Sequence, residues 1–175
     1  TTLFRSTDED MALLSGITRS ADNPYGIPVA FCFLDPAAND LKSPVLSGET
    51  LYLAAKVKRV PHFEEAFGYA FESVVIRAWE QGIGTVWIGG TMNRKNFEEA
   101  IGLQADEVMP CVTPVGYPAA KRTLRETAMR KGVRADWRFD LKDIAHEGGS
   151  DQPLSDAVLK KYGDVLEWVR WAPSA

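Results

Sequence analysis

The chain contains few of the side chains that usually carry out catalysis unaided. Its 175 residues include two histidines, His62 and His146, and two cysteines, Cys32 and Cys111. His146 lacks the second histidine of a zinc-protease motif, and neither Cys-x-x-Cys nor Gly-x-Ser-x-Gly occurs. The sequence therefore predicts no metal site and no catalytic side chain, and it favours exposed loop positions for both histidines.

An excess of positive charge and long apolar runs are also missing. The net charge of -4 argues against nucleic acid or an anionic membrane as a partner, because both bind clustered positive charge. No apolar stretch approaches the roughly 20 residues that cross a bilayer. Both cysteines lie in apolar, strand-like runs, which is typical of buried thiols in a reducing compartment. We therefore expect a cytoplasmic protein.

The residues that are present have an ordinary globular composition, with 45% hydrophobic and 25% charged residues, which predicts one domain over residues 1–175. Capping residues and apolar spacing predict helices from Thr7 to Gly16, over 64–81 and 93–102, and from Asp164 to Ala172. Strands are expected over 27–34 and 51–55, with an extended segment at 85–88. This alternation predicts an α+β fold with three layers, α/β/α.

Three further expectations concern particular elements. Residues 108–117 have a strand pattern, but Pro110 and Pro114 cannot donate ladder hydrogen bonds, so this strand is expected at an edge or with a bulge. Val165, Trp168 and Val169 are expected to be buried by the last helix. Four aromatic residues are expected in the core rather than against a cofactor: Phe67, Phe71, Trp79 and Trp87.

The densest signal is the glycine-rich segment 82–91, Gly-Ile-Gly-Thr-Val-Trp-Ile-Gly-Gly-Thr. It is not a phosphate-binding P-loop, because no Lys-Ser/Thr pair follows, and it lacks the third glycine of a Rossmann motif. One reading is a helix cap at Gly82 and a tight turn at Gly89-Gly90. The alternative is that two adjacent glycines let backbone N–H groups approach a flat ring closely.

Together with Gly-Tyr-Pro at 116–118 and Val-Arg-Trp-Ala-Pro-Ser-Ala at 169–175, this segment resembles the FMN-dependent nitroreductase family. The resemblance implies a mixed sheet flanked by helices, and a homodimer or an intramolecular pseudo-dimer with flavin at the interface. It implies an oxidoreductase that uses FMN, with NAD(P)H as reductant and a nitroaromatic, quinone or similar small molecule as acceptor. The flavin, rather than a side chain, carries the chemistry in this family.

The resemblance also assigns candidate cofactor-binding residues. Ile88, Gly89 and Gly90 match the segment that lies along the flavin ring. Lys121, Arg122 and Arg125 follow Gly-Tyr-Pro, where the family places positive charge for the flavin phosphate. Pro173 and Ser174 match a segment that contacts the ring of a flavin held mainly by the other subunit or half.

Two family features are missing, the opening Arg-x-Ser-x-Arg segment and the Asn and Gln that follow Pro-Ser-Ala. We therefore interpret the chain as an internal piece of a longer one. The alternative function is a catalytically inactive flavin-binding or scaffold domain of the same fold.

Overall fold

The computed structural model describes residues 7–46, 48–117, 124–132 and 134–172, which belong to two compact units. One unit ends at Glu126 and the other begins at Thr127, and each is described by itself. A single domain over residues 1–175 stays a prediction. None of the described helices is long and apolar enough to cross a bilayer.

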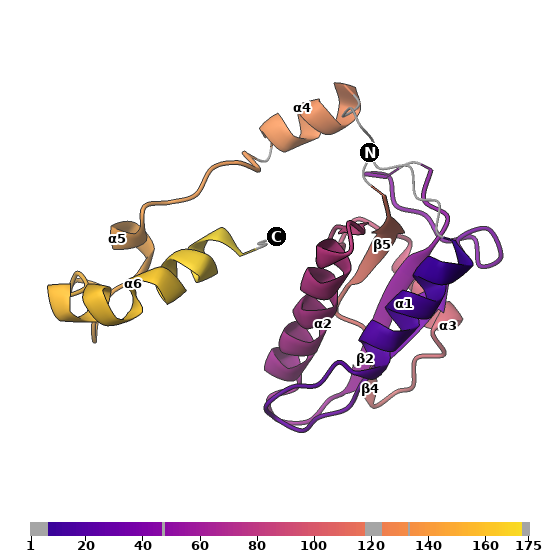
Figure 1. Ribbon diagram of the computed structural model, residues 1–175, viewed down its shortest axis with the longest axis horizontal. Helices are drawn as coiled ribbons and strands as arrows, with labels where there is room; N and C mark the ends of the chain where they lie inside the picture. Colours follow the sequence, from indigo (N-terminus) through magenta and orange to yellow (C-terminus); the bar gives the residue numbers. More distant parts are fainter. Residues whose placement is uncertain (1–6, 47, 118–123, 133, 173–175) are drawn as a thin grey trace. The chain divides into compact units, whose positions relative to one another are not determined.

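The first unit is built on an antiparallel sheet (Figure 1). Its strands follow the order β1 (Val29–Leu34), β2 (Tyr52–Lys58), β5 (Val112–Gly116) and β3 (Gly84–Thr85), while β4 (Glu107–Val108) pairs with the far end of β2. Helices flank this sheet, so the predicted α+β fold class is confirmed. The sequence predicted a mixed sheet, whereas every strand pair among the described residues is antiparallel.

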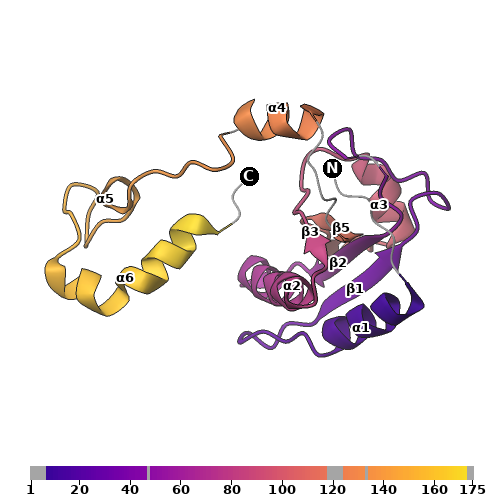
Figure 2. The ribbon, with the colours of Figure 1, turned by 45° about the horizontal axis from the view of Figure 1, so that its top comes forward.

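Two helices cover one face of the sheet, α1 (Asp8–Arg19) and α2 (Phe63–Glu80), and α3 (Arg94–Ala100) lies on the other (Figure 2). The alternation of side chains along β2 explains these layers. Leu53 packs with Leu14 of α1 and Val74 of α2, whereas its neighbour Tyr52 packs with Phe97 of α3. The predicted three layers are therefore present in this unit.

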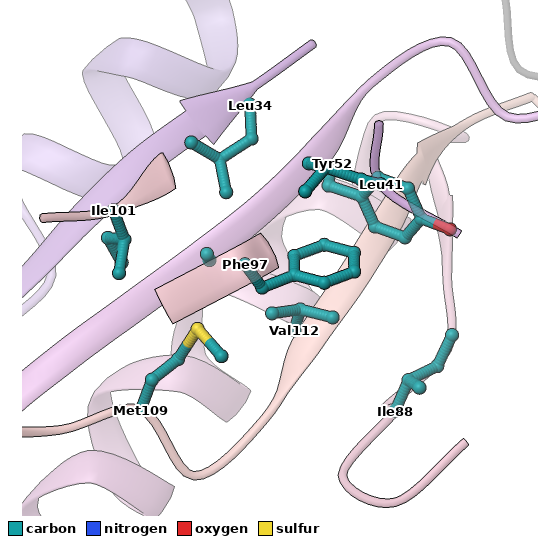
Figure 3. Close-up of a cluster of buried hydrophobic side chains, with 9 residues drawn as sticks. Leu34, Leu41, Tyr52, Ile88, Phe97, Ile101, Met109 and Val112 are labelled. Carbon is teal, nitrogen blue, oxygen red and sulfur yellow. The ribbon is translucent and has the colours of Figure 1, made fainter. Parts of the chain in front are cut away.

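A cluster of buried hydrophobic side chains lies beneath α3 (Figure 3). The Tyr52 ring meets the Phe97 ring edge-on, with 4.9 Å between centroids. Ile88 comes from the glycine-rich segment and belongs to the same cluster. This burial anchors the glycine-rich segment to the core.

Local sequence determines where the helices of this unit begin and end. Thr7 caps α1, as expected from the sequence, and the structure shows that Asp10 completes a reciprocal capping box with it. The helix does not end at Gly16, as predicted, but continues to Arg19, because Ile17 packs into the core below it. α2 ends at Glu80, just before Gly82 as predicted; the φ of 78° at Gly82 suits glycine and lets the Ile83 N–H return to the Ala78 carbonyl.

Of the four aromatic residues expected in the core, Trp87 is half-buried against Phe67 and Phe71, and Trp79 is not in the core. Phe67 and Phe71 are buried with Val74 and Ala78, which all lie on the same side of α2. Trp79 is 73% exposed. It follows Ala78 directly, and successive helical residues are about 100° apart, so Trp79 points away from the sheet.

The strand expected over 108–117 is split, and its second part is not an edge. β5 lies between β2 and β3, with Pro114 opposite Tyr52. The Val115 N–H donates to the carbonyl of Leu51, the residue before β2. Because successive residues of a strand direct their backbone groups to opposite neighbours, the nitrogen of Pro114 faces β3. There β3 has already ended at Thr85, and the Val86 N–H donates to the Thr113 hydroxyl instead. An interior proline is tolerated because no acceptor on that side requires a donor from it.

The second unit contains α5 (Leu141–Ile144) and α6 (Asp156–Trp171), while α4 (Leu124–Gly132) includes the boundary. α6 does not begin at Asp164, as predicted, but at Asp156, after the N-cap Ser155, whose hydroxyl accepts the Val158 N–H. The expected burial of its apolar side chains is also wrong for the described residues, since Trp168 is 72% exposed and Val165 and Val169 are exposed as well. The end of the helix next to Ala172 is confirmed.

Candidate functional site

The turn at Ile88–Gly90 follows a backbone bridge to β5. The Ile88 N–H donates to Val112 at 2.8 Å, and the Val112 N–H donates to the Ile88 carbonyl at 3.0 Å. The carbonyl and the following N–H of a trans peptide point in opposite directions. Because the Ile88 carbonyl faces Val112, the Gly89 N–H faces away from the sheet.

Arg94, at the start of α3, holds the orientation of the peptide between Gly89 and Gly90. Its Nη1 donates to the Met109 carbonyl at 2.7 Å, and its Nη2 donates to the Gly89 carbonyl and, at 3.4 Å, to the Pro110 carbonyl. By the same peptide geometry, the Gly90 N–H points away from the guanidinium. Glu98 lies 3.6 Å from Arg94 and partly offsets its charge, so the main effect of Arg94 here is on orientation.

Both amides are free and accessible. Gly89 and Gly90 are exposed, and neither N–H donates to an acceptor among the described residues. A Cβ added at Gly90 would meet nothing within 4 Å, and one at Gly89 would meet only the Pro110 carbonyl, at 3.6 Å. Neither glycine has the positive φ that would make glycine necessary for the turn. This geometry favours the interpretation in which the missing side chains leave room for a ligand.

The arrangement suits a flat ligand with acceptor atoms on its edge. Two neighbouring N–H donors are held by contacts on their inner side, so they need not reorganise when a ligand arrives. The isoalloxazine ring of FMN is such a ligand, and the residues present at the turn fit it.

The side chains of the other predicted site residues are not among those that the structure describes. Lys121, Arg122, Pro173 and Ser174 lie outside the described residues, and Arg125 belongs to α4 without a described side chain. Of the predicted site residues, the structure describes Ile88, Gly89 and Gly90 together at one turn. Sequence reasoning missed Arg94, and its position four residues after the Gly89-Gly90 pair was the signal that could have indicated it.

Side-chain chemistry elsewhere is sparse. Within the described ranges, no three His, Cys, Asp or Glu side chains gather in a way that could hold a metal ion. Both histidines are exposed, as predicted. Burial raises the pKa of the Cys32 thiol and raises that of Cys111 to about 12, so both thiols stay protonated and unreactive at neutral pH.

Comparisons with known proteins point to one family. A family model described as "Putative TM nitroreductase" matches residues 9–175. A comparison with curated protein sequences finds no match.

Three solved structures represent the similar folds. A nitroreductase family protein from Clostridium difficile 630 has a TM-score of 0.58 at 14% identity, covering 83% of this chain and 88% of that one. An oxidoreductase containing FMN has a TM-score of 0.60 at 12% identity over 84% of both chains. An FMN-dependent nitroreductase from Clostridium difficile R20291 has a TM-score of 0.54 at 14% identity, covering 69% of this chain and 83% of that one. At these identities, the likeness to solved structures shows the fold.

Proposed function

Because the chain belongs to the TM nitroreductase family, we propose that it is an FMN-dependent oxidoreductase, with NAD(P)H as electron donor and a nitroaromatic, quinone or similar small molecule as acceptor. The observation that carries this proposal is the pair of free, outward-facing amides at Gly89 and Gly90. Bound FMN would supply the redox chemistry.

The chain's own residues bind and orient the ring. The N–H groups of Gly89 and Gly90 donate to acceptor atoms on the ring edge, and such donors stabilise negative charge that develops there. Arg94 and Val112 hold the two peptides from behind, through the carbonyls of Gly89 and Ile88. The absence of Cβ atoms on the two glycines allows the ring to approach the backbone.

The remaining roles rest on the family resemblance. We propose that Lys121, Arg122 and Arg125 hold the flavin phosphate, because guanidinium and ammonium groups pair with phosphate oxygens. Pro173 and Ser174 would contact the ring of a flavin held by the other subunit or half. A cytoplasmic location, with neither nucleic acid nor a membrane as partner, remains our prediction.

A homodimer or an intramolecular pseudo-dimer is part of the proposal. It is supported by exposed apolar side chains on α2, namely Tyr69, Ile76 and Trp79, because large exposed apolar patches mark interaction surfaces. Equilibrium sedimentation distinguishes the two arrangements, since a homodimer doubles the mass of the chain. A monodisperse monomer that still binds FMN would exclude the homodimer.

The decisive experiment is reconstitution of the purified chain with FMN. We expect a yellow complex whose visible flavin band is bleached by NADH or NADPH without oxygen and restored by a nitroaromatic or a quinone. A chain that takes up no FMN would contradict the proposal. A complex that stays yellow with both reductants would instead support the catalytically inactive flavin-binding domain.

A further inference from the structure

The segment that follows the two glycines is hydrogen-bonded to the connection between β1 and β2. The Ser43 hydroxyl donates to the Thr91 carbonyl at 2.6 Å. The Asn93 N–H donates to the Lys42 carbonyl at 3.1 Å, and the Lys42 N–H donates to the Asn93 side chain at 2.8 Å. Two segments that are distant in sequence are therefore joined next to the glycine turn. The family resemblance assigns none of these residues a role.

The side chain of Asn93 does not cap its own helix. Asn93 is the N-cap residue of α3, where a side-chain oxygen usually accepts an N–H of the first turn, yet it makes no such hydrogen bond. Its Nδ2 instead donates to the Asp40 carbonyl at 2.7 Å, while its Oδ1 accepts the Lys42 N–H. Both polar atoms of the side chain therefore hold the β1–β2 connection rather than the helix.

The β1–β2 connection is a firm support at this point. Leu41 is buried in the cluster beneath α3 (Figure 3), and its N–H donates to the Pro36 carbonyl at 2.9 Å. The Leu46 N–H donates to the Ser43 carbonyl at 3.1 Å. Ser43 itself is only 5% exposed, so water does not readily replace its hydroxyl as the partner of Thr91. The Thr91 carbonyl is thus tied to a part of the chain that is packed into the core.

The turn is therefore held on both sides of Gly90. Arg94 holds the Gly89 carbonyl before Gly90, and Ser43 holds the Thr91 carbonyl after it. Between them lies one peptide, Gly90–Thr91, whose carbonyl and N–H have no hydrogen-bond partner within the described ranges. Glycine has the widest backbone freedom of all residues, so a turn held on one side only would let the Gly90 amide change direction.

We propose that Ser43 is a positioning residue for the flavin turn and that Asn93 supports it. Ser43 acts through the Thr91 carbonyl and requires no contact with the flavin. This inference rests on the proposed FMN function, in which the amides of Gly89 and Gly90 donate to the ring edge. Donors that are oriented in advance stabilise negative charge most effectively, and reduction adds negative charge to the ring. Losing the contact of Ser43 should therefore weaken binding of reduced FMN more than binding of oxidised FMN.

The first test uses the full chain without FMN. Backbone amide order parameters from NMR relaxation should lie near the rigid value of about 0.85 at Gly90 and Thr91, and Ser43→Ala should lower them toward about 0.6. Ser20→Ala is the matched control, because the Ser20 hydroxyl also donates to a backbone carbonyl, that of Gly16 at 2.9 Å. It should leave both values unchanged. Unchanged values in Ser43→Ala would overturn the proposal whether or not the chain binds flavin.

A second variant guards against a failure of Ser43→Ala to fold. Asn93→Asp keeps an oxygen for the Lys42 N–H but loses the donor to the Asp40 carbonyl, and aspartate is as good an N-cap as asparagine, so α3 should persist. We expect the order parameters of Gly90 and Thr91 to fall in this variant too. Wild-type values there would contradict the role of Asn93.

The second test measures the two-electron potential of bound FMN. Ser43→Ala should lose about tenfold more affinity for reduced than for oxidised FMN, the difference between a charge-assisted and a neutral hydrogen bond, which lowers the potential by about 30 mV. A variant that was merely less stable would keep the wild-type potential, as Ser20→Ala should, and that result would overturn the proposal. If the wild type took up no FMN, the proposed function would fail by itself, while the order parameters would still decide whether Ser43 holds the turn.

Discussion

Replacing Gly90 by alanine should raise stability and lower FMN affinity at the same time. The new Cβ meets no protein atom within 4 Å, and the backbone at Gly90 is not in the left-handed region. Gly→Ala at such a position stabilises a protein by about 0.4–1 kcal/mol, because the unfolded chain loses conformational freedom. The same methyl group would stand between the Gly90 amide and a ring lying against it. Losing that hydrogen bond costs about 1–3 kcal/mol, or about 5- to 150-fold in Kd.

Two measurements on one variant separate these effects. Chemical denaturation of the FMN-free protein gives the free energy of unfolding, and quenching of FMN fluorescence gives Kd. The opposite signs are informative, because a variant that merely damaged the turn would lose both stability and affinity.

Gly16→Ala is the matched control. Gly16 is an exposed glycine inside α1, and a Cβ there also meets nothing within 4 Å. This variant should gain up to about 1 kcal/mol from helix propensity and keep the FMN affinity of the wild type. If Gly90→Ala also bound FMN as the wild type does, the ring would not lie against Gly90 and the reasoning would be refuted.

Three other changes test the orientation of the turn, the core and one charged contact. Arg94→Lys leaves one donor group in place of a fork that reaches three carbonyls, so FMN should bind about tenfold more weakly, read by quenching of FMN fluorescence. Phe97→Ala should lower the free energy of unfolding by about 3–5 kcal/mol in a denaturant titration, because Phe97 is completely buried; a loss under about 1 kcal/mol would contradict the described packing. The Tyr117 hydroxyl donates to Asp10 at 2.6 Å and lowers the pKa of that carboxyl, so this contribution to stability is present above the unfolded pKa of about 3.9 and is lost as the pH falls through the folded value. Tyr117→Phe should therefore be less stable than the wild type at neutral pH, with a difference that shrinks on acidification; a constant difference would refute this assignment.

Local patterns predicted several elements well. The cap of α1 at Thr7, the apolar spacing of α2 and the end of α2 next to Gly82 each depend on neighbouring residues only. The Ile88–Gly90 segment was also identified from sequence, because a pair of glycines after an apolar run is visible without a fold. Its partners were not visible, since Arg94 and Val112 reach the turn only through the folded sheet and α3.

Predictions that depended on neighbours in space failed in identifiable ways. The strand that contains Pro114 was expected at an edge or with a bulge because proline cannot donate to a ladder, but the position is interior because β3 ends before it would need that donor. The start of α6 was placed at Asp164, after Gly163. The helix instead runs through Gly163, because one interior glycine costs only about 1 kcal/mol.

The sequence by itself determined the alternation of helices and strands, the scarcity of catalytic side chains and the glycine pair that leaves backbone exposed. Those properties follow from residue types and their spacing along the chain. Only the tertiary structure decided which amides of the turn face outward, because that orientation is set by the Ile88 and Gly89 carbonyls, which are held by Val112 and Arg94. A hydrogen bond between residues distant in sequence has no local signature, since its energy is realised only when the sheet and α3 bring the two groups together.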